Sequence, residues 1–152
     1  MTITEPARDA GQRKRDVLER LEREEDIWVA SADGDGVPFL VPLWFRWDGE
    51  AVWLATRLTS RTARNLRATG RARLAFPATR DVVLVDGEAE VFTAEDVPAA
   101  AADGFAERYG WEPRGDHASY GYLRVLPRTV QAWRGEYEMP GRHVMREGRW
   151  TA

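Results

Sequence analysis

The stretch from residue 27 to residue 56 constrains the fold most, because apolar and polar residues alternate along it and two glycine-containing turns interrupt it. This pattern predicts a three-stranded antiparallel meander joined by DGDG and by Asp48-Gly49, with strands at residues 27–31, 37–47 and 51–56. Pro38 and Pro42 lie in the second of these strands, and proline has no backbone N–H to donate. We therefore expect the second strand to be unpaired along part of one edge, or bulged.

The rest of the chain predicts three more strands and a small hairpin. The strands are expected at residues 71–76, at residues 81–92 with a bulge at Asp86-Gly87, and at residues 119–134 with a break at Pro127. A closing hairpin is expected from residues 143–146 and 149–151. Six antiparallel strands with helices inserted between them are typical of a small closed or partly closed barrel.

Helical spacing appears in three places. Val17, Leu18 and Leu21 predict an amphipathic helix over residues 12–25. A second, short helix follows Thr59 and Ser60 and ends at Gly70. A third is expected to open on a capping box formed by Thr93 and Asp96, to run through Val97, Ala101 and Phe105, and to stop near Gly110.

Composition narrows the class of protein. The chain has 152 residues, which predicts one domain, and we expect it over residues 13–152 after a flexible tail over residues 1–12. The chain has no cysteine and a net charge of −3. Disulfides and thiolate chemistry are excluded, and the acidic balance predicts neither nucleic-acid nor membrane partners. No segment resembles a signal peptide or membrane span, which predicts a cytoplasmic location. Arginine outnumbers lysine 21 to 1, as a GC-rich bacterial genome would produce.

The second helix is the best candidate site. Thr59 or Ser60 can cap its N-terminus, and Arg61, Arg64 and Arg67 follow without an acidic residue among them. Free N–H groups, hydroxyls and guanidiniums converging at one helix end favour an anion, of which phosphate is the usual one. A capped surface helix with solvated arginines explains the same residues about equally well.

Tryptophan is more frequent than one core of this size normally needs. Indoles left at a barrel rim favour a dimer interface or a stacked planar ligand, whereas each one taken singly is more often plain core. The residues concerned are Trp28, Trp44, Trp47, Trp53, Trp133 and Trp150.

The order of motifs resembles the pyridoxamine 5′-phosphate oxidase-like FMN-binding split-barrel superfamily, and more closely its actinobacterial flavin/deazaflavin oxidoreductase branch. The motifs are WLAT, S-x-T-A-R-N-L, R-x-R-L-A-F, VVLVDGEAEV and L-P-R-T-V-Q-A-W, spread over most of residues 13–133. The resemblance implies a mainly β (α+β) fold, a six-stranded antiparallel Greek-key split barrel with two or three peripheral helices. It also implies a homodimer with FMN or the deazaflavin F420 in a groove shared by the two subunits.

The resemblance also assigns cofactor-binding residues. A family pattern like S-x-K-x-R-N-L grips the cofactor phosphate, and Thr62 stands here where the lysine would be, so that Arg57, Arg61 or Arg64 would have to supply the missing cation. Thr56 and the strand before it would face the ring, and Pro42 and Trp44 would floor the pocket. The implied set is Pro42, Trp44, Thr56, Arg57, Ser60, Arg61, Thr62, Arg64 and Asn65.

No catalytic acid, base or nucleophile stands out, which is compatible with hydride transfer because the cofactor carries that chemistry. His117 and His143 are too isolated to predict a metal site and are expected in loops or at the surface. Tyr120 and Tyr122 could reach a substrate pocket, although alternate tyrosines in a strand are more often structural. The C-terminal segment, residues 133–149, is either a solvated tail or lies near a partner's cofactor, where Arg142 or Arg146 would be the residue to test.

Two functions of different classes follow. The first is an oxidoreductase that passes a hydride from reduced FMN or F420 to a small conjugated, planar acceptor. The second is a non-catalytic protein that binds or sequesters flavin, deazaflavin or haem in the same groove; a haem ligand would have to be His117 or His143. Pyridoxamine phosphate oxidase activity itself is a weaker third, because Gln131 replaces the acid of that enzyme's terminal motif.

Overall fold

The computed structural model describes residues 5–116 and 119–152, and in them the chain forms a closed six-stranded antiparallel β-barrel. The strands follow the order β3-β2-β1-β4-β5-β6, and pairing of β3 with β6 closes the barrel. Their bounds are β1 (Asp26–Ala32), β2 (Pro38–Trp47), β3 (Val52–Arg57), β4 (Arg71–Ala75), β5 (Val82–Phe92) and β6 (Tyr120–Trp133). The expected mainly β barrel with peripheral helices is confirmed.

A short hairpin extends the sheet beyond β6. It consists of β7 (His143–Arg146) and β8 (Arg149–Trp150), which turn at Glu147 and Gly148, both with positive φ. The predicted closing hairpin is therefore confirmed.

The meander forms as predicted, and its prolines have the expected effect. The second strand, β2, pairs with β1 from Pro38 to Trp44, but with β3 only from Phe45 to Trp47. The stretch that contains both prolines thus keeps one edge unpaired.

The bulge predicted at Asp86-Gly87 is also confirmed, whereas the break predicted at Pro127 is wrong. Strand β6 continues through Pro127, and the register with β5 shifts there, so that Gly87 faces Pro127 and Asp86 faces Thr129. A Cβ on residue 87 would lie 2.5 Å from the carbonyl oxygen of Leu126, so only glycine fits. The ladder skips Arg128, the extra residue next to Pro127, so strand β6 continues past the proline through a bulge.

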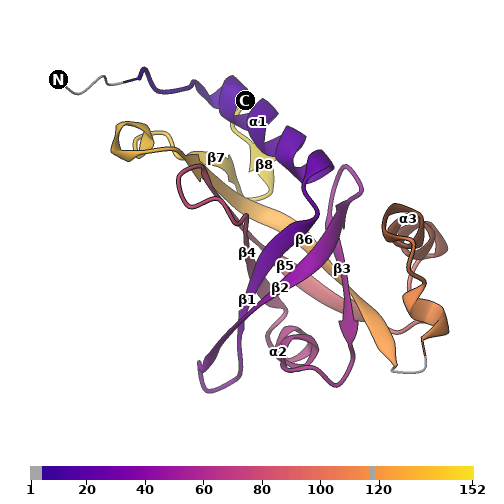
Figure 1. The fold of residues 1–152 in the computed structure, drawn as a ribbon. Coiled ribbons are helices and arrows are strands. Elements are labelled where there is room, and N and C mark those ends of the chain that lie inside the picture. Colours follow the sequence, from indigo (N-terminus) through magenta and orange to yellow (C-terminus); the bar gives the residue numbers. More distant parts are fainter. Residues whose placement is uncertain (1–4, 117–118) are drawn as a thin grey trace.

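Helices close the two ends of the barrel. Figure 1 shows α1 (Ala10–Arg23) across one end and α2 (Arg61–Thr69) across the other. Val17 and Leu21 of α1, and Ala63 and Leu66 of α2, insert into the main core. Asp9 caps α1, so this helix begins two residues before the predicted Gln12. Ser60 rather than Thr59 caps α2, and Gly70 ends it in the left-handed conformation.

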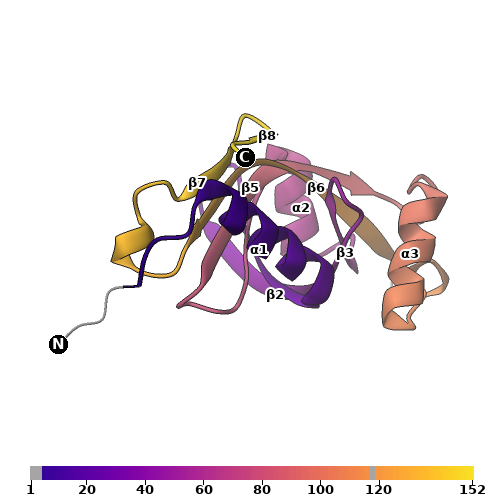
Figure 2. The same cartoon turned by 90° about the horizontal axis from the view of Figure 1, so that it is seen from above.

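The third helix, α3 (Ala99–Tyr109), lies at the side of the barrel (Figure 2). The two reciprocal capping-box bonds between Thr93 and Asp96 form, but the helix begins only at Ala99, with Pro98 at its N-cap. The box therefore closes an isolated turn, because Pro98 has no N–H to continue the helical bonds and disfavours a helical conformation at the residue before it. Gly110 ends α3 as predicted.

The described residues form two apolar cores. The main one fills the barrel and is formed by residues such as Phe45, Leu54 and Leu123. The smaller one lies between α3 and the outer face of β3 and β6, where Phe105, Trp53 and Tyr122 meet. No described helix is long and apolar enough to cross a membrane.

Part of the barrel surface is apolar, as the excess of tryptophan predicts. Trp47 and Trp53 are buried, whereas Trp28 and Trp44 are 39% and 44% exposed. We call the exposed apolar residues of this surface the apolar ribbon: Trp28, Val37, Phe39, Leu40 and Trp44.

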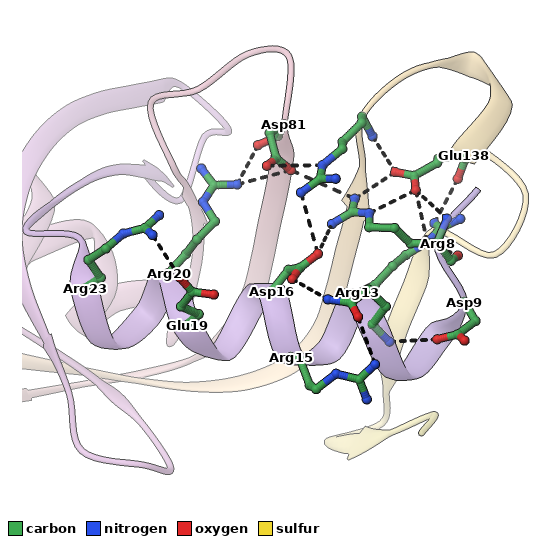
Figure 3. Close-up of polar contacts among 12 residues, drawn as sticks. Arg8, Asp9, Arg13, Arg15, Asp16, Glu19, Arg20, Arg23, Asp81 and Glu138 are labelled. Carbon is green, nitrogen blue, oxygen red and sulfur yellow. Dashed lines mark hydrogen bonds and ion pairs between the residues drawn. The ribbon is translucent and has the colours of Figure 1, made fainter. Parts of the chain in front are cut away.

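A buried carboxylate ties the two ends of the chain together. Glu138 is fully buried in a short 3₁₀ turn, η2 (Glu136–Glu138), and accepts hydrogen bonds from Arg8 N, Nε and Nη2 at 2.7–2.9 Å and from Arg134 N at 2.8 Å (Figure 3). These bonds, led by the Arg8 side chain, hold the pKa of Glu138 at about 2. Arg8, which lies in the tail expected over residues 1–12, thus contacts a charge 130 residues away in the sequence.

Other charges extend this contact along α1. The guanidinium of Arg13, 2% exposed, donates to the carbonyl oxygens of Ala132 and Glu138, both at 2.9 Å. Arg20, 7% exposed, donates to the carbonyl oxygen of Asp81 at 2.7 Å. We call this cluster the ionic clamp. Its members are Arg8, Arg13, Asp16, Arg20, Asp81, Arg134 and Glu138.

Candidate functional site

A cavity of about 500 Å³ opens between β2, β3, the start of α2 and the connection after α3. The N-terminal residues of α2 meet the ends of two strands there, because β3 leads directly into the helix. Five of the nine residues assigned to a site from the sequence line this cavity: Pro42, Trp44, Thr56, Arg57 and Ser60.

The hydroxyls at the start of α2 are arranged around the helix N-terminus. Ser60 Oγ accepts the hydrogen bond of Ala63 N at 3.1 Å, and Thr56 Oγ1 lies 3.5 Å from Ser60 Oγ. The first turn contains no acidic residue. The end of the helix dipole and the remaining free N–H groups therefore favour an anion at this point.

One arginine lines the cavity, and three more lie along the solvent face of α2. Arg57, Arg61, Arg64 and Arg67 are all exposed, and none of them forms an ion pair with a carboxylate of the described residues. Arg57 stands over the ring of Tyr120, with its guanidinium carbon 5.8 Å from the ring centroid. Unpaired guanidiniums keep their capacity for two parallel hydrogen bonds to a phosphate.

Two of the assigned residues do not reach this surface. Thr62 is 1% exposed and Asn65 is 3% exposed, and Asn65 Nδ2 donates to Ser31 Oγ at 3.1 Å. They share the barrel-facing side of α2 with Ala63 and Leu66, as helical spacing requires. The place of the family lysine thus lies on the buried side of this helix, and the exposed cations next to it are Arg61 and Arg64.

Sequence reasoning named Trp44 and Tyr120 but missed Tyr109 and Trp111, which complete an aromatic wall on the other side of the cavity. Trp111 lines the cavity together with Trp44 and Tyr120, and Tyr109 stacks on Trp44 with centroids 4.8 Å apart. Trp111 meets Tyr120 edge to face at 4.9 Å. The cluster Tyr109-Gly110-Trp111 at a helix end was a visible signal, but only the lateral position of α3 brings it to the cavity.

Helix α3 is attached firmly beside this wall. The hydroxyl of Tyr109 donates to the carbonyl oxygen of Phe45, and Arg108 donates to the carbonyl oxygens of Glu22, Arg23 and Glu24 at the end of α1. Burial raises the pKa of Tyr109, so it stays a donor at neutral pH. The hydrogen bond of Tyr109 therefore holds this end of the aromatic wall in place.

Tyr122 occupies a special position behind the wall. Its side chain is fully buried, and its hydroxyl has no hydrogen-bond partner among the described residues. Burial raises the pKa of this phenol. A buried hydroxyl without a partner destabilises a fold by about 1–3 kcal/mol.

The histidines and the C-terminal segment lie elsewhere. His117 lies outside the described residues. His143 is half-buried on β7, and burial, followed by the charges of Arg146 and Arg142, lowers its pKa. Arg142 donates to Gln131 Oε1 at 3.2 Å. Within residues 5–116 and 119–152 no group of three or more His, Cys, Asp or Glu could hold a metal ion.

A second cavity, of about 790 Å³, lies beyond the other end of α2. Two of its three arginines are paired, because Arg73 binds both oxygens of Asp86 at 2.5 and 3.0 Å and Arg128 lies 3.8 Å from Glu88, whereas Arg71 has no ion pair among the described residues. The first cavity also has the N-terminus of α2, so it is the better anion site.

Comparisons with known proteins agree with this fold. The family model described as pyridoxamine 5′-phosphate oxidase matches residues 14–136. A comparison with curated proteins finds no match.

Several solved structures have the same fold. HutZ, the haem storage protein from Vibrio cholerae, superposes with a TM-score of 0.68 at 14% identity, over 90% of this chain and 99% of that one. A putative pyridoxamine 5′-phosphate oxidase from Listeria innocua gives 0.66 at 14% identity, over 80% and 98%. A protein described as an F420 reductase gives 0.58 at 24% identity, over 74% and 93%. At these identities the likeness shows the fold alone.

Proposed function

Because this chain belongs to the pyridoxamine 5′-phosphate oxidase family, we propose that it is an oxidoreductase that binds FMN or the deazaflavin F420. In this proposal it passes a hydride to a small conjugated, planar acceptor, and two copies of the chain form the working unit. The likeness to a protein described as an F420 reductase supports the deazaflavin as one of the two candidates.

One observation carries the proposal: unpaired arginines surround a helix N-terminus that opens into an aromatic cavity. Both cofactors combine a phosphate group with a planar ring system, and this site offers a matching surface for each part. Arg57, Arg61 and Arg64 have no carboxylate partner among the described residues, so a phosphate would find their hydrogen-bonding capacity free.

The residues present divide into three roles. Ser60 and the N-terminal N–H groups of α2 would bind the phosphate together with the arginines. Thr56 and the backbone of β3 would hold the polar edge of the ring, and Trp44 would pack against its apolar part. The cofactor supplies hydride transfer when it is bound, whereas the protein orients the ring and excludes water.

The apolar ribbon supports the two-copy arrangement. Exposed apolar surface of this kind marks an interaction site in soluble proteins. It includes Trp44, which also lines the cavity, so a second copy packed on this ribbon would border the cofactor site.

A non-catalytic binding role in the same cavity is the second candidate. The aromatic wall of Trp44, Trp111 and Tyr120 suits any planar ligand, haem included. The likeness to the haem storage protein HutZ adds to this alternative.

Titration of the purified protein with FMN, F420 and haemin tests the proposal. Replacing Arg61 or Arg64 with alanine should weaken cofactor binding by about 1.5–3 kcal/mol, roughly 10- to 150-fold in Kd. Arg67→Ala is the matched control, because Arg67 lies in the last turn of the same helix and should leave the affinity unchanged.

Each result has a clear meaning. Binding of one cofactor that depends on Arg61 or Arg64, followed by turnover of a quinone, supports the oxidoreductase. Binding without turnover supports the carrier role. If all three alanine variants bind the cofactor as tightly as the wild type does, the phosphate site at α2 is rejected.

A further inference from the structure

The hydroxyl of Tyr122 carries an inference that deepens the proposed function. It is the polar side-chain group that stays fully buried without a partner in the described parts of the chain. Such a group is satisfied in most proteins, and one that is left over at a ligand site calls for an explanation. A ligand atom that accepts its hydrogen bond is one.

The position of Tyr122 connects it with the cavity. In the ladder of β3 and β6, Tyr122 faces Ala55, and Ala55 lines the cavity. Tyr120, two residues earlier on the same strand, also lines the cavity. Residues two apart in a strand share a face, so the floor under Tyr120 continues toward Tyr122.

A layer of aromatic rings separates the hydroxyl from the cavity. Phe105 lies edge to face on Tyr122 at 6.1 Å, and Trp111 lies edge to face on Phe105 at 6.1 Å. Trp111 belongs to the short connection between α3 and the 3₁₀ turn η1 (Pro113–Gly115). Its indole is half-buried, and no hydrogen bond to another described residue fixes it. Trp111 is therefore held by ring contacts with Trp44, Phe105 and Tyr120 rather than by hydrogen bonds.

We propose that the cavity has an inner extension, reached when the side chains of Trp111 and Phe105 move aside, in which the hydroxyl of Tyr122 donates a hydrogen bond to a carbonyl oxygen of the acceptor. This inference rests on the proposed function. The ligand class is a planar conjugated ketone or quinone, because the walls are aromatic and the single buried polar group is a donor. Tyr122 positions this substrate, and the bond would strengthen as negative charge develops on the oxygen.

The test uses Tyr122→Phe and two measurements on the protein without cofactor. The first is the thermal midpoint: since the hydroxyl has no partner, removing it should leave the midpoint unchanged or raise it. The second is binding of menadione, followed by tryptophan fluorescence. The variant should bind this quinone about tenfold more weakly.

Two controls isolate the hydrogen bond. 2-Methylnaphthalene has the same ring system without oxygen, so its affinity should be equal in the wild type and in Tyr122→Phe. Tyr120→Phe removes a hydroxyl from the same strand and should change menadione affinity less than Tyr122→Phe does. A lower thermal midpoint for Tyr122→Phe, equal menadione affinity, or no menadione binding by the wild type would each overturn the inference.

Cofactor titration keeps this result apart from the proposed function. Tyr122→Phe should bind FMN or F420 as the wild type does. If neither cofactor binds while menadione discriminates between the two proteins, the quinone subsite stands and the cofactor proposal fails. If a cofactor binds and menadione does not discriminate, the subsite fails alone.

Discussion

The two ends of the barrel use arginine in opposite ways. At the α1 end, the side chains of Arg8, Arg13 and Arg20 are mostly buried and bind oxygens of the protein, those of Glu138 and Asp81 among them. At the α2 end, Arg61 and Arg64 are exposed and have no carboxylate partner among the described residues.

The arginines at the α1 end therefore stabilise the fold, whereas those at the α2 end are free to bind a ligand. A buried cation that loses its partner becomes an uncompensated charge, so removing a charged member of the ionic clamp should destabilise the fold. An exposed cation without a partner contributes little to stability, yet it can bind an anion without first breaking a bond. The same residue type thus closes one end of the barrel and leaves the other available to a ligand (Figure 1).

Removing the central charge of the clamp should have the largest effect. Glu138→Gln removes the carboxylate charge that accepts three bonds from Arg8 and leaves Asp16 as its nearest anion, and we expect a loss of about 3–5 kcal/mol in the free energy of unfolding. Urea denaturation measures it. Glu136→Gln, two residues earlier and exposed, is the matched control and should stay within about 0.5 kcal/mol. If Glu138→Gln and Glu136→Gln lower the free energy of unfolding equally, the buried charge does not set the α1 end apart from the α2 end.

Acid should weaken the clamp next. The pKa of Glu138 falls from 4.5 to about 2 in the folded protein, so the unfolded chain binds the proton more tightly. The stabilisation is therefore complete above pH 4.5 and is lost as the pH falls toward 2, by about 3 kcal/mol in total. Denaturation curves at several pH values measure this slope. In Glu138→Gln this part of the slope should disappear; an unchanged slope would assign acid sensitivity to other groups.

The α2 end should show the smallest change in stability. Ser60→Ala removes the N-cap bond to Ala63 and should lower the free energy of unfolding by about 1 kcal/mol. Thr59→Ala is its control, because Ser60 and not Thr59 makes the cap bond. A loss as large as that of Glu138→Gln would show that this end is also needed to hold the barrel together.

Local patterns predicted the barrel well. The bulge at Asp86-Gly87 and the caps at Ser60 and Gly70 depend on neighbouring residues, and all are present. The third helix begins later than predicted, because the fixed ring of Pro98 overrides the capping box before it.

Long-range contacts could not be predicted in the same way. The bond between Arg8 and Glu138 joins residues 130 positions apart, and no local pattern in either segment indicates the other as its partner. The inward side of α2 was partly visible, since Thr62 and Asn65 share helical spacing with Ala63 and Leu66. The aromatic wall required the position of α3, which no local pattern contains.

The half-paired edge of β2 limits how another chain can approach it. Bonds from Phe45 N to Glu25 O and from Asp33 N to Val37 O show that odd-numbered residues of this segment turn their backbone groups toward β1. The even-numbered residues turn theirs to the open edge. Two of those, Pro38 and Pro42, have no N–H, which leaves only Leu40 and Trp44 as donors.

An incoming strand would therefore find every second donor missing and could not continue the sheet. A second copy on the apolar ribbon must pack through side chains, and the two prolines protect this edge against amyloid-like stacking. In hydrogen exchange, the amides of Leu40 and Trp44 should exchange quickly, while those of Val41 and Leu43, on the same strand, exchange slowly.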